Sequence, residues 1–219
     1  MNTLKQLIAL IFGILWTGHI MAIEEPKYKV LLSDGPFEIR QYDPVLIAET
    51  IVDGDMDEAS NKGFRLIADY IFGNNQIANS SASEKIAMTA PVTVEPQSEH
   101  MSMTEPVMNE AQSHGSMMQS AKQWRVNFVM PSHYTLASIP KPKNSTVTLR
   151  EVPARYFVVL KYSGFNTVSR VQSETQKAIE WALKNRSTIM GAPKLSRYDP
   201  PWTLPMFRRN EIMIEISAP

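Results

Sequence analysis

Two stretches of helical periodicity, each set between strand-like runs, constrain the fold of this chain more than any other feature. Residues 28–52 alternate and are broken by turn residues, which predicts an antiparallel meander. Apolar residues then recur at steps of three and four over 56–70, as on one helical face. Strand patterns return over 124–162, followed by a helix over about 167–185 and a last strand over 211–216. This order predicts a duplicated α+β unit.

The first helix has clear start and stop features. Acidic residues occupy its first turn at Asp55, Asp57 and Glu58, and Gly73-Asn74 follows its last apolar position. Further along the chain, residues 146–152 and 155–162 both alternate, with Pro153-Ala154 between them. This spacing predicts that the two runs pair as a hairpin.

The N-terminal segment has the pattern of a secretory signal. Lys5 precedes ten apolar residues, from Leu7 to Trp16, whereas a membrane span takes about 20. We expect cleavage after Ala22, export, most naturally to a bacterial periplasm, and no stable membrane span afterwards. Residues 1–22 would then be a signal peptide and 23–219 one domain; an uncleaved N-terminal anchor is the alternative.

Composition excludes several classes of function. The 22 basic and 22 acidic residues cancel and no basic run occurs, which argues against a nucleic-acid partner. The chain has no cysteine, so disulfides and thiolate chemistry are excluded. Motifs of nucleophile elbows, phosphate loops and zinc proteases are also missing, which predicts a protein without catalytic activity. Nothing in the sequence indicates an oligomeric state.

Residues 95–121 interrupt the pattern. They are polar and aperiodic, which predicts a long, mobile surface loop rich in methionine and histidine. Thioether and imidazole groups suit copper, especially Cu(I), so the candidate metal ligands are His100, Met101, Met103, His114, Met117 and Met118. The same side chains could instead cap a bound haem, or the loop could bind nothing.

Five ordered motifs resemble the SOUL haem-binding protein family. They are Phe37-Glu38-Ile39-Arg40-Gln41-Tyr42, Lys85-Ile86-Ala87-Met88-Thr89-Ala90-Pro91-Val92, Phe128-Val129-Met130-Pro131-Ser132, Arg150-Glu151-Val152-Pro153, and Tyr198-Asp199-Pro200-Pro201 with Arg208-Arg209-Asn210-Glu211-Ile212. The resemblance implies a distorted antiparallel β-barrel with two flanking helices and a pseudo-twofold repeat. It also implies binding of haem or a related tetrapyrrole in a shallow apolar cleft.

The sequence departs from the family pattern at the positions that would contact the ligand. The family member that names the group has a histidine in the first motif where this chain has Gln41, and an amide is a poor axial ligand. Relatives without that histidine contact the tetrapyrrole through an arginine, a methionine and a lysine of the first helix. Those positions fall here on Asn61, Phe64 and Asp69.

The first helix carries a second stripe beside its core-facing one. It is too apolar for a solvated face, so a flat macrocycle could lie on its aromatic residues while Lys62 or Arg65 reaches a propionate. Alternatively, its phenylalanines only widen the core contact. The candidate haem-cleft residues are Asn61, Lys62, Phe64, Arg65, Ala68, Phe72 and, from the first motif, Gln41.

Magnitudes predict weak binding. A shallow cleft that covers about 300 Å² of porphyrin gains about 7–8 kcal/mol, while association costs about 4–15 kcal/mol. An exchangeable carrier or buffer of haem is therefore the favoured function. The alternatives are a periplasmic copper-binding protein that uses the Met/His-rich loop, and a binder of other apolar small molecules on an effector-binding-like scaffold.

Overall fold

The computed structural model describes residues 23–97, 118 and 120–219. Its helix α2 (Met56–Ile71) begins where the acidic residues predicted it, because the Asp55 carboxylate accepts hydrogen bonds from the backbone N–H groups of Asp57 and Glu58, both at 2.9 Å. The predicted core-facing positions, from Met56 to Tyr70, are buried. The start, end and buried face of this helix are confirmed.

Helix α4 (Val168–Lys184) is confirmed within a residue at each end. Thr167 caps it by accepting from the backbone N–H of Arg170, and Asn185 follows its last turn. Val168, Val171, Thr175, Ala178 and Ala182 recur at steps of three and four, which places them on one helical face. All are buried except Val168, which is the first residue of the helix and is 45% exposed.

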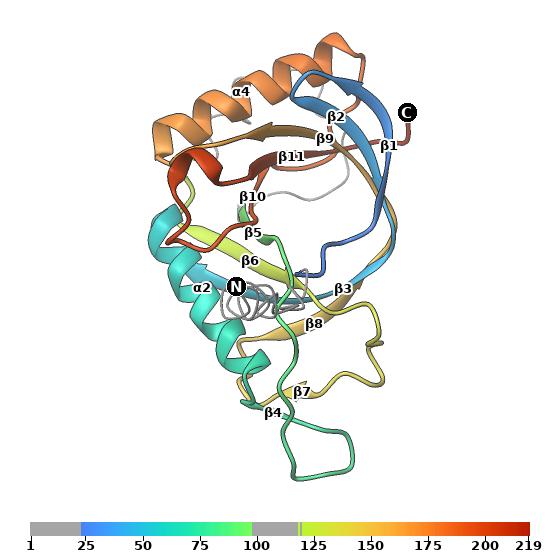
Figure 1. Cartoon of the computed structure of the whole chain (residues 1–219), viewed down its shortest axis with the longest axis vertical. Helices are drawn as coiled ribbons and strands as arrows, with labels where there is room; N and C mark the ends of the chain where they lie inside the picture. Colours follow the sequence, from blue (N-terminus) through green and yellow to red (C-terminus); the bar gives the residue numbers. More distant parts are fainter. Residues whose placement is uncertain (1–22, 98–117, 119) are drawn as a thin grey trace, which may run out of the picture.

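In the described part of the chain, nine strands form one curved sheet whose neighbours are all antiparallel. Its order is β1-β2-β9-β11-β10-β5-β6-β3-β8. Figure 1 shows the sheet curling into an open barrel with both helices on its outer side. The bounds of the strands are β1 Tyr28–Asp34, β2 Phe37–Tyr42, β3 Val45–Asp53, β5 Val92–Pro96, β6 Gln123–Val129, β8 Thr148–Val152, β9 Arg155–Tyr162, β10 Lys194–Arg197 and β11 Asn210–Ile216.

Two small elements lie outside this sheet. Strands β4 (Asn75–Gln76) and β7 (Lys141–Pro142) form a separate two-stranded sheet, and η1 (Pro205–Phe207) is a short 3₁₀ helix between β10 and β11. No described helix is both long and apolar enough to cross a membrane. The α+β barrel with two flanking helices is the fold that the sequence predicted.

The strand order reveals the duplication. One unit is β3-α2-β5-β6 and the other is β9-α4-β10-β11, and they meet where β5 pairs with β10. The strand before each unit joins the other unit, since β2 pairs with β9 and β8 pairs with β3. The predicted hairpin across Pro153-Ala154 is therefore wrong. That short link, like Asp43-Pro44, carries the chain from one unit into the other.

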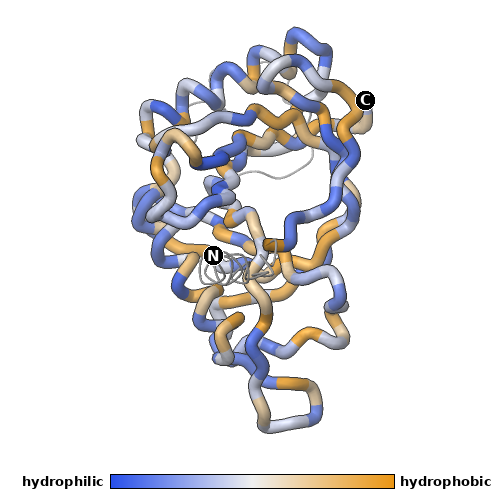
Figure 2. Tube along the Cα trace, in the orientation of Figure 1, coloured by the Kyte–Doolittle hydropathy of each residue, from blue (hydrophilic) through white to orange (hydrophobic). Residues whose placement is uncertain are grey.

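One main core lies between the two helices and the outer face of the sheet. It takes side chains from both units, including Ile67 of α2, Ile179 of α4, and Phe128, Leu195 and Ile212 of the strands, all at 0% exposure. Figure 2 shows apolar colour along the strands and polar colour on the outer sides of the helices. Each fully buried side chain of this size contributes about 1.5–3 kcal/mol, so both units depend on a shared core.

The stretch around the predicted loop differs in detail. The alternating residues 86–94 predict a strand, but β5 begins only at Val92; Ile86 is buried, and its N–H donates to the carbonyl of Ile71 at 2.8 Å. At the other side, β5 runs through Pro96, so the first residues of the predicted loop 95–121 belong to the sheet.

Candidate functional site

The outer stripe of α2 is partly exposed, as a surface site requires. Phe64 is 37% and Phe72 56% exposed, whereas Ala68 between them is buried at 7%. Eight residues separate the two phenylalanines, which is about 12 Å along a helix axis. The stripe therefore presents two aromatic rings with a small residue between them, a surface on which a flat ring can lie.

Phe64 serves the core and the surface together. Its ring centroid lies 5.5 Å from that of Phe128, a fully buried residue of β6. Phe64 therefore widens the core contact on one side of its ring, while more than a third of the side chain stays open to solvent; its contact with a ligand stays a prediction. An aromatic ring held in this way is oriented before any ligand arrives.

Three polar side chains belong to the same helix as the rings: around the helix axis, Asn61 and Arg65 lie within about 100° of Phe64, whereas Lys62 lies about 160° away. Asn61, Lys62 and Arg65 are exposed, and within the described ranges Lys62 and Arg65 form no ion pair. Two cations without carboxylate partners beside exposed aromatic rings can receive the carboxylates of an amphipathic ligand.

Gln41 lies away from this stripe. It belongs to β2, where its register partners are Lys29 of β1 and Tyr156 of β9. Helix α2 packs instead on β3, β5 and β6. The structure thus separates Gln41 from the α2 residues with which the family resemblance grouped it.

The candidate copper ligands are mostly beyond what the structure describes. His100, Met101, Met103, His114 and Met117 lie outside the described residues, while Met118 is 2% exposed in the main core. The described histidine, His133, contacts Tyr134, with ring centroids 4.1 Å apart and ring planes tilted by 40°. Among the described residues no three histidine or carboxylate side chains are grouped as a metal site would need.

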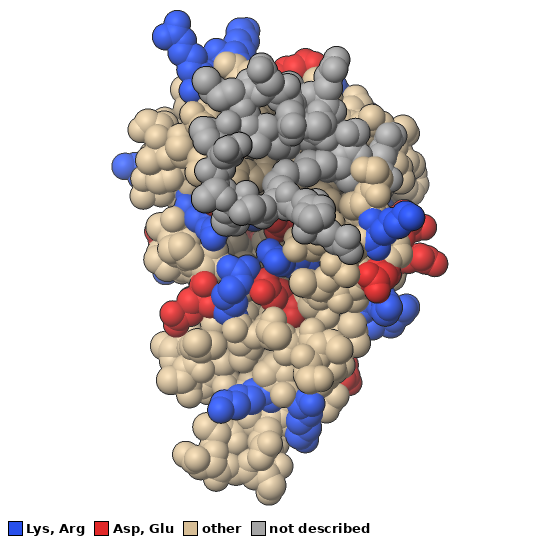
Figure 3. Space-filling model, turned by 180° about the vertical axis from the view of Figure 1, so that it is seen from behind, with Lys and Arg blue, Asp and Glu red and all other residues tan. Residues whose placement is uncertain are grey.

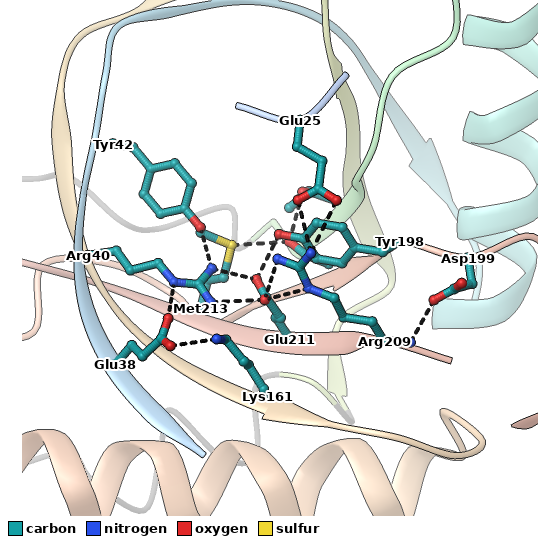
Figure 4. Close-up of polar contacts among 12 residues, drawn as sticks. Glu25, Glu38, Arg40, Tyr42, Lys161, Tyr198, Asp199, Arg209, Glu211 and Met213 are labelled. Atoms are coloured by element: carbon teal, nitrogen blue, oxygen red, sulfur yellow. Dashed lines mark hydrogen bonds and ion pairs between the residues drawn. The ribbon is translucent and has the colours of Figure 1, made fainter. Parts of the chain in front are cut away.

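The inner face of the sheet holds a buried network of charges that the sequence did not reveal as a unit (Figure 4). The guanidinium of Arg40 donates to Glu38 at 2.6 Å and to Glu211 at 2.9 Å, and Arg40 and Glu211 are both 0% exposed. Tyr198 donates to the same Glu211 carboxylate at 2.7 Å. Burial and the adjacent Glu211 raise the pKa of Tyr198, so it stays a hydrogen-bond donor.

Arg209 extends this network toward the surface. Its guanidinium pairs with Glu211 at 2.9 Å and with Glu25 at 3.0 Å, and its Cζ lies 3.7 Å from the ring centroid of Tyr198. Arg209 and Glu211, two residues apart in one sequence motif, thus form a charge pair within this network. The residues of this network have a structural role, because each carboxylate and each guanidinium already pairs with an opposite charge.

Charge pairs also cross the other half of the inner face. Arg150 donates to Glu49 at 2.8 Å, and Arg155 to Glu215 at 2.7 Å. On the face seen in Figure 3, basic and acidic residues likewise lie side by side across the middle of the molecule. The alternation within a single strand indicates that one side of it is polar. Which opposite charges meet depends on the pairing of strands that are far apart in the sequence.

A small pocket lies beside the N-terminal segment. Its volume is about 170 Å³, and residues such as Glu24, Lys27, Pro131 and Tyr134 line it. Pockets that enclose drug-sized ligands have volumes of about 300–1,000 Å³. A tetrapyrrole does not fit inside this pocket.

Comparison with known proteins gives a family match and several similar folds. The family model described as "SOUL heme-binding protein" matches residues 23–215. No curated protein matches the sequence significantly. The crystal structure of the EcmrR C-terminal domain has a TM-score of 0.55 and 10% identity, over 88% of this chain and 99% of that one.

Two structures from Listeria innocua have similar folds. An uncharacterized conserved protein has a TM-score of 0.51 and 11% identity, over 83% of this chain and 92% of that one. A protein titled as a hydrolase has a TM-score of 0.50 and 10% identity, over 85% and 94%. At these identities the likeness concerns the fold alone.

Proposed function

Because the chain belongs to the SOUL haem-binding protein family, we propose that it binds haem or a related tetrapyrrole on the outer stripe of α2. The observation that supports this site is the pair of exposed rings, Phe64 and Phe72, beside two cations without described ion-pair partners. We further propose that binding is weak and exchangeable, without catalysis, and that the exported chain carries or buffers its ligand.

The residues present fit a macrocycle better than an iron centre. Haem supplies a flat apolar ring, two carboxylates and an iron that takes axial ligands. Phe64 and Phe72 offer ring contact, Ala68 leaves room between them, and Lys62 and Arg65 offer charge for the carboxylates. Around this stripe the described residues include no histidine, so packing and charge hold the ligand there.

The open geometry supports a low affinity. A ligand on a helix surface is covered on one side only. The free energy gained from about 300 Å² of contact, about 7–8 kcal/mol, lies within the range of the cost of association, about 4–15 kcal/mol. Even with the lowest cost of association, about 4 kcal/mol, a gain of about 7–8 kcal/mol leaves about 3–4 kcal/mol, so ring contact alone corresponds to a dissociation constant near millimolar, weaker than micromolar. Such a ligand is released readily, as a carrier or buffer needs.

Titration with haemin and with metal-free protoporphyrin tests the site. We expect both to bind the chain that starts at Ile23 with similar affinity, because ring packing dominates. Phe72→Ala and Arg65→Glu should each weaken binding several-fold, because they remove a ring contact and reverse a charge at the proposed site. Both side chains are exposed, so the variants should keep the fold. Leu183→Ala and Lys184→Glu are matched controls on α4, where Leu183 is 49% exposed.

Three results would reject this proposal. Binding that survives both α2 substitutions would place the ligand elsewhere. Equal losses in the α4 controls would show non-specific adsorption. Binding of haemin without binding of protoporphyrin would show that iron ligation, and not the α2 surface, holds the ligand.

Export is tested separately. We expect the full chain to be recovered from the periplasm of a bacterial host with its N-terminus at Ile23. N-terminal sequencing of the recovered protein checks this. Recovery from the membrane with residues 1–22 attached would support the anchored alternative.

A further inference from the structure

The connection between β10 and β11 exposes several large apolar side chains that do not pack in the core. In the 200–207 loop, Trp202 is 82%, Phe207 72%, Met206 64% and Leu204 58% exposed. Phe165, from the β9–α4 connection, is 62% exposed and neighbours the loop, because the N–H of Gly164 donates to the carbonyl of Pro205 at 2.9 Å. Contiguous exposed apolar surface of this kind marks an interaction site.

The exposed side chains stand on a rigid backbone. The N–H of Thr203 donates to the carbonyl of Pro200 at 3.0 Å, and that of Phe207 to the carbonyl of Leu204 at 2.9 Å. The guanidinium of Arg208 donates to the carbonyls of Thr203 and Pro201, at 2.7 and 2.5 Å. The loop is therefore held in shape before it meets a partner, which lowers the entropy cost of binding.

The same hydrogen bonds lower the free-energy cost of transferring the loop out of water. Backbone polar groups that lose water without a new partner cost several kcal/mol each in a lipid environment. Here three residues are prolines, which have no N–H, and several of the remaining donors and acceptors are already paired within the loop. This property suits an apolar medium better than a protein interface, which needs groups free to form hydrogen bonds across it.

Charge is distributed as at a membrane surface. Residues 200–207 carry no charge; Asp199 precedes them, and Arg208 and Arg209 follow, of which Arg209 is already paired with Glu25 and Glu211. Arg208 forms no ion pair with the described carboxylates, and its Cζ lies 5.5 Å from the ring centroid of Phe165. An apolar tip next to the Arg208 guanidinium, whose Nη1 forms none of the loop's hydrogen bonds, matches the acyl region and a phosphate group of an anionic bilayer.

We propose that the 200–207 loop docks this protein onto the surface of an anionic lipid bilayer. Trp202, Leu204, Met206 and Phe207 enter the boundary between headgroups and acyl chains, and the Arg208 guanidinium faces the lipid phosphates. Figure 1 shows the red-orange segment around η1 at the margin of the molecule, beside α2 and α4. This site goes beyond the proposed tetrapyrrole site and does not depend on it.

Vesicle binding tests the proposal. The chain from Ile23 holds every described strand and helix, and its core residues all lie within it, so it serves as the test protein. We expect it to sediment with phosphatidylcholine vesicles that contain phosphatidylglycerol, and less with phosphatidylcholine alone. Trp202 emission should shift to the blue and be quenched by lipids brominated on the acyl chains.

Substitutions assign the binding to the loop. Trp202→Asp should weaken vesicle binding by about tenfold or more, because it replaces inserted aromatic surface with a charge. Trp202→Phe should keep most of the binding and lose the emission shift. The matched control is Leu136→Asp, which adds the same charge at a 48% exposed apolar residue between β6 and β7. Circular dichroism verifies that each variant folds.

Each unfavourable outcome overturns the proposal. One is no sedimentation with either vesicle. Another is an equal loss in Trp202→Asp and Leu136→Asp, which would indicate general charge repulsion. A third is loss of haemin binding in Trp202→Asp without any vesicle binding in the parent, which would assign the loop to the tetrapyrrole.

Discussion

The charged state of Arg40 depends on partners that come from different strands of the sheet. Burial favours its neutral form, but hydrogen bonds and charge from Glu211 and Tyr42 outweigh burial and raise its pKa. Its partners on one side, Glu38 and Tyr42, lie two residues away on the same strand. Glu211 lies on β11, and β9 separates that strand from β2.

Replacing Arg40 should be costly. Arg40→Met keeps much of the side-chain length but leaves Glu38 and Glu211 with less positive charge in a buried site, and breaking a buried pair in this way costs about 3–5 kcal/mol. Arg150→Met is the comparison, because the Arg150 side chain is 41% exposed and Glu49 keeps Arg125 at 3.6 Å, so we expect a smaller loss than for Arg40→Met. Urea unfolding measures both; losses of equal size would contradict the argument.

Glu49 should make stability depend on acid pH. Burial alone would raise its pKa, but the hydrogen bonds from Arg150 and the charges of Arg150 and Arg125 hold the pKa below the ordinary value of 4.5. A lowered carboxylate pKa stabilises the fold above pH 4.5, and this contribution is lost as the pH falls through the folded-state pKa.

Glu49→Gln should therefore lower the free energy of unfolding at neutral pH and flatten its decline in acid. Unfolding series at several pH values check this, with exposed Glu151→Gln as the control. An unchanged acid slope in Glu49→Gln would show that Glu49 is not linked to folding. Sequence alone indicated neither this pair nor the Arg40 network, because Glu49 meets Arg150 only through the register of β3 with β8.

At the scale of elements, sequence predicted what local rules determine. Asp55 and Thr167 marked the helix starts because capping needs only neighbouring residues. The supposed hairpin at Pro153-Ala154 failed because alternation shows that a run is a strand but not which strand it pairs with. The α2 stripe was foreseen from spacing, whereas the distance of Gln41 from it required the sheet order.

The packing of α2 on β6 depends on Gly63. A Cβ at this position would lie 2.5 Å from Cγ2 of Val126, so the helix approaches the sheet where no side chain intervenes. Gly63→Ala gains about 1 kcal/mol of helix propensity but meets a clash worth about 1–3 kcal/mol. We expect net destabilisation in the native background.

The sign should reverse when the clash is removed. Val126→Gly removes all three side-chain atoms that meet the added Cβ, at 2.5, 2.6 and 3.1 Å, so in that background the alanine at position 63 finds space and its helix propensity should make Gly63→Ala stabilising. A double-mutant cycle in urea measures the coupling. Additive effects would show that the close approach of α2 to β6 does not restrict position 63.

For the whole molecule, the crossed strands and the shared core predict one cooperative unfolding transition. Trp124 reports on the first unit and Trp181 on α4 of the second, and both are buried. In a Trp202→Phe background, replacing either of them with phenylalanine leaves the other as reporter. Within each variant we expect the fluorescence midpoint to coincide with the circular dichroism midpoint. Separate midpoints would mean that the units unfold independently.

The exchange of β2 and β8 also determines what a shorter chain could do. A chain with one strand ahead of a single strand–helix–strand–strand unit could not pair that first strand within itself, because in this fold the strand always completes the other unit. Two such chains would complete each other about a two-fold axis, each donating its first strand. The protein thus has the topology of a strand-exchanged dimer joined into one polypeptide, and a cut between β6 and β8 would leave two fragments that hold each other together.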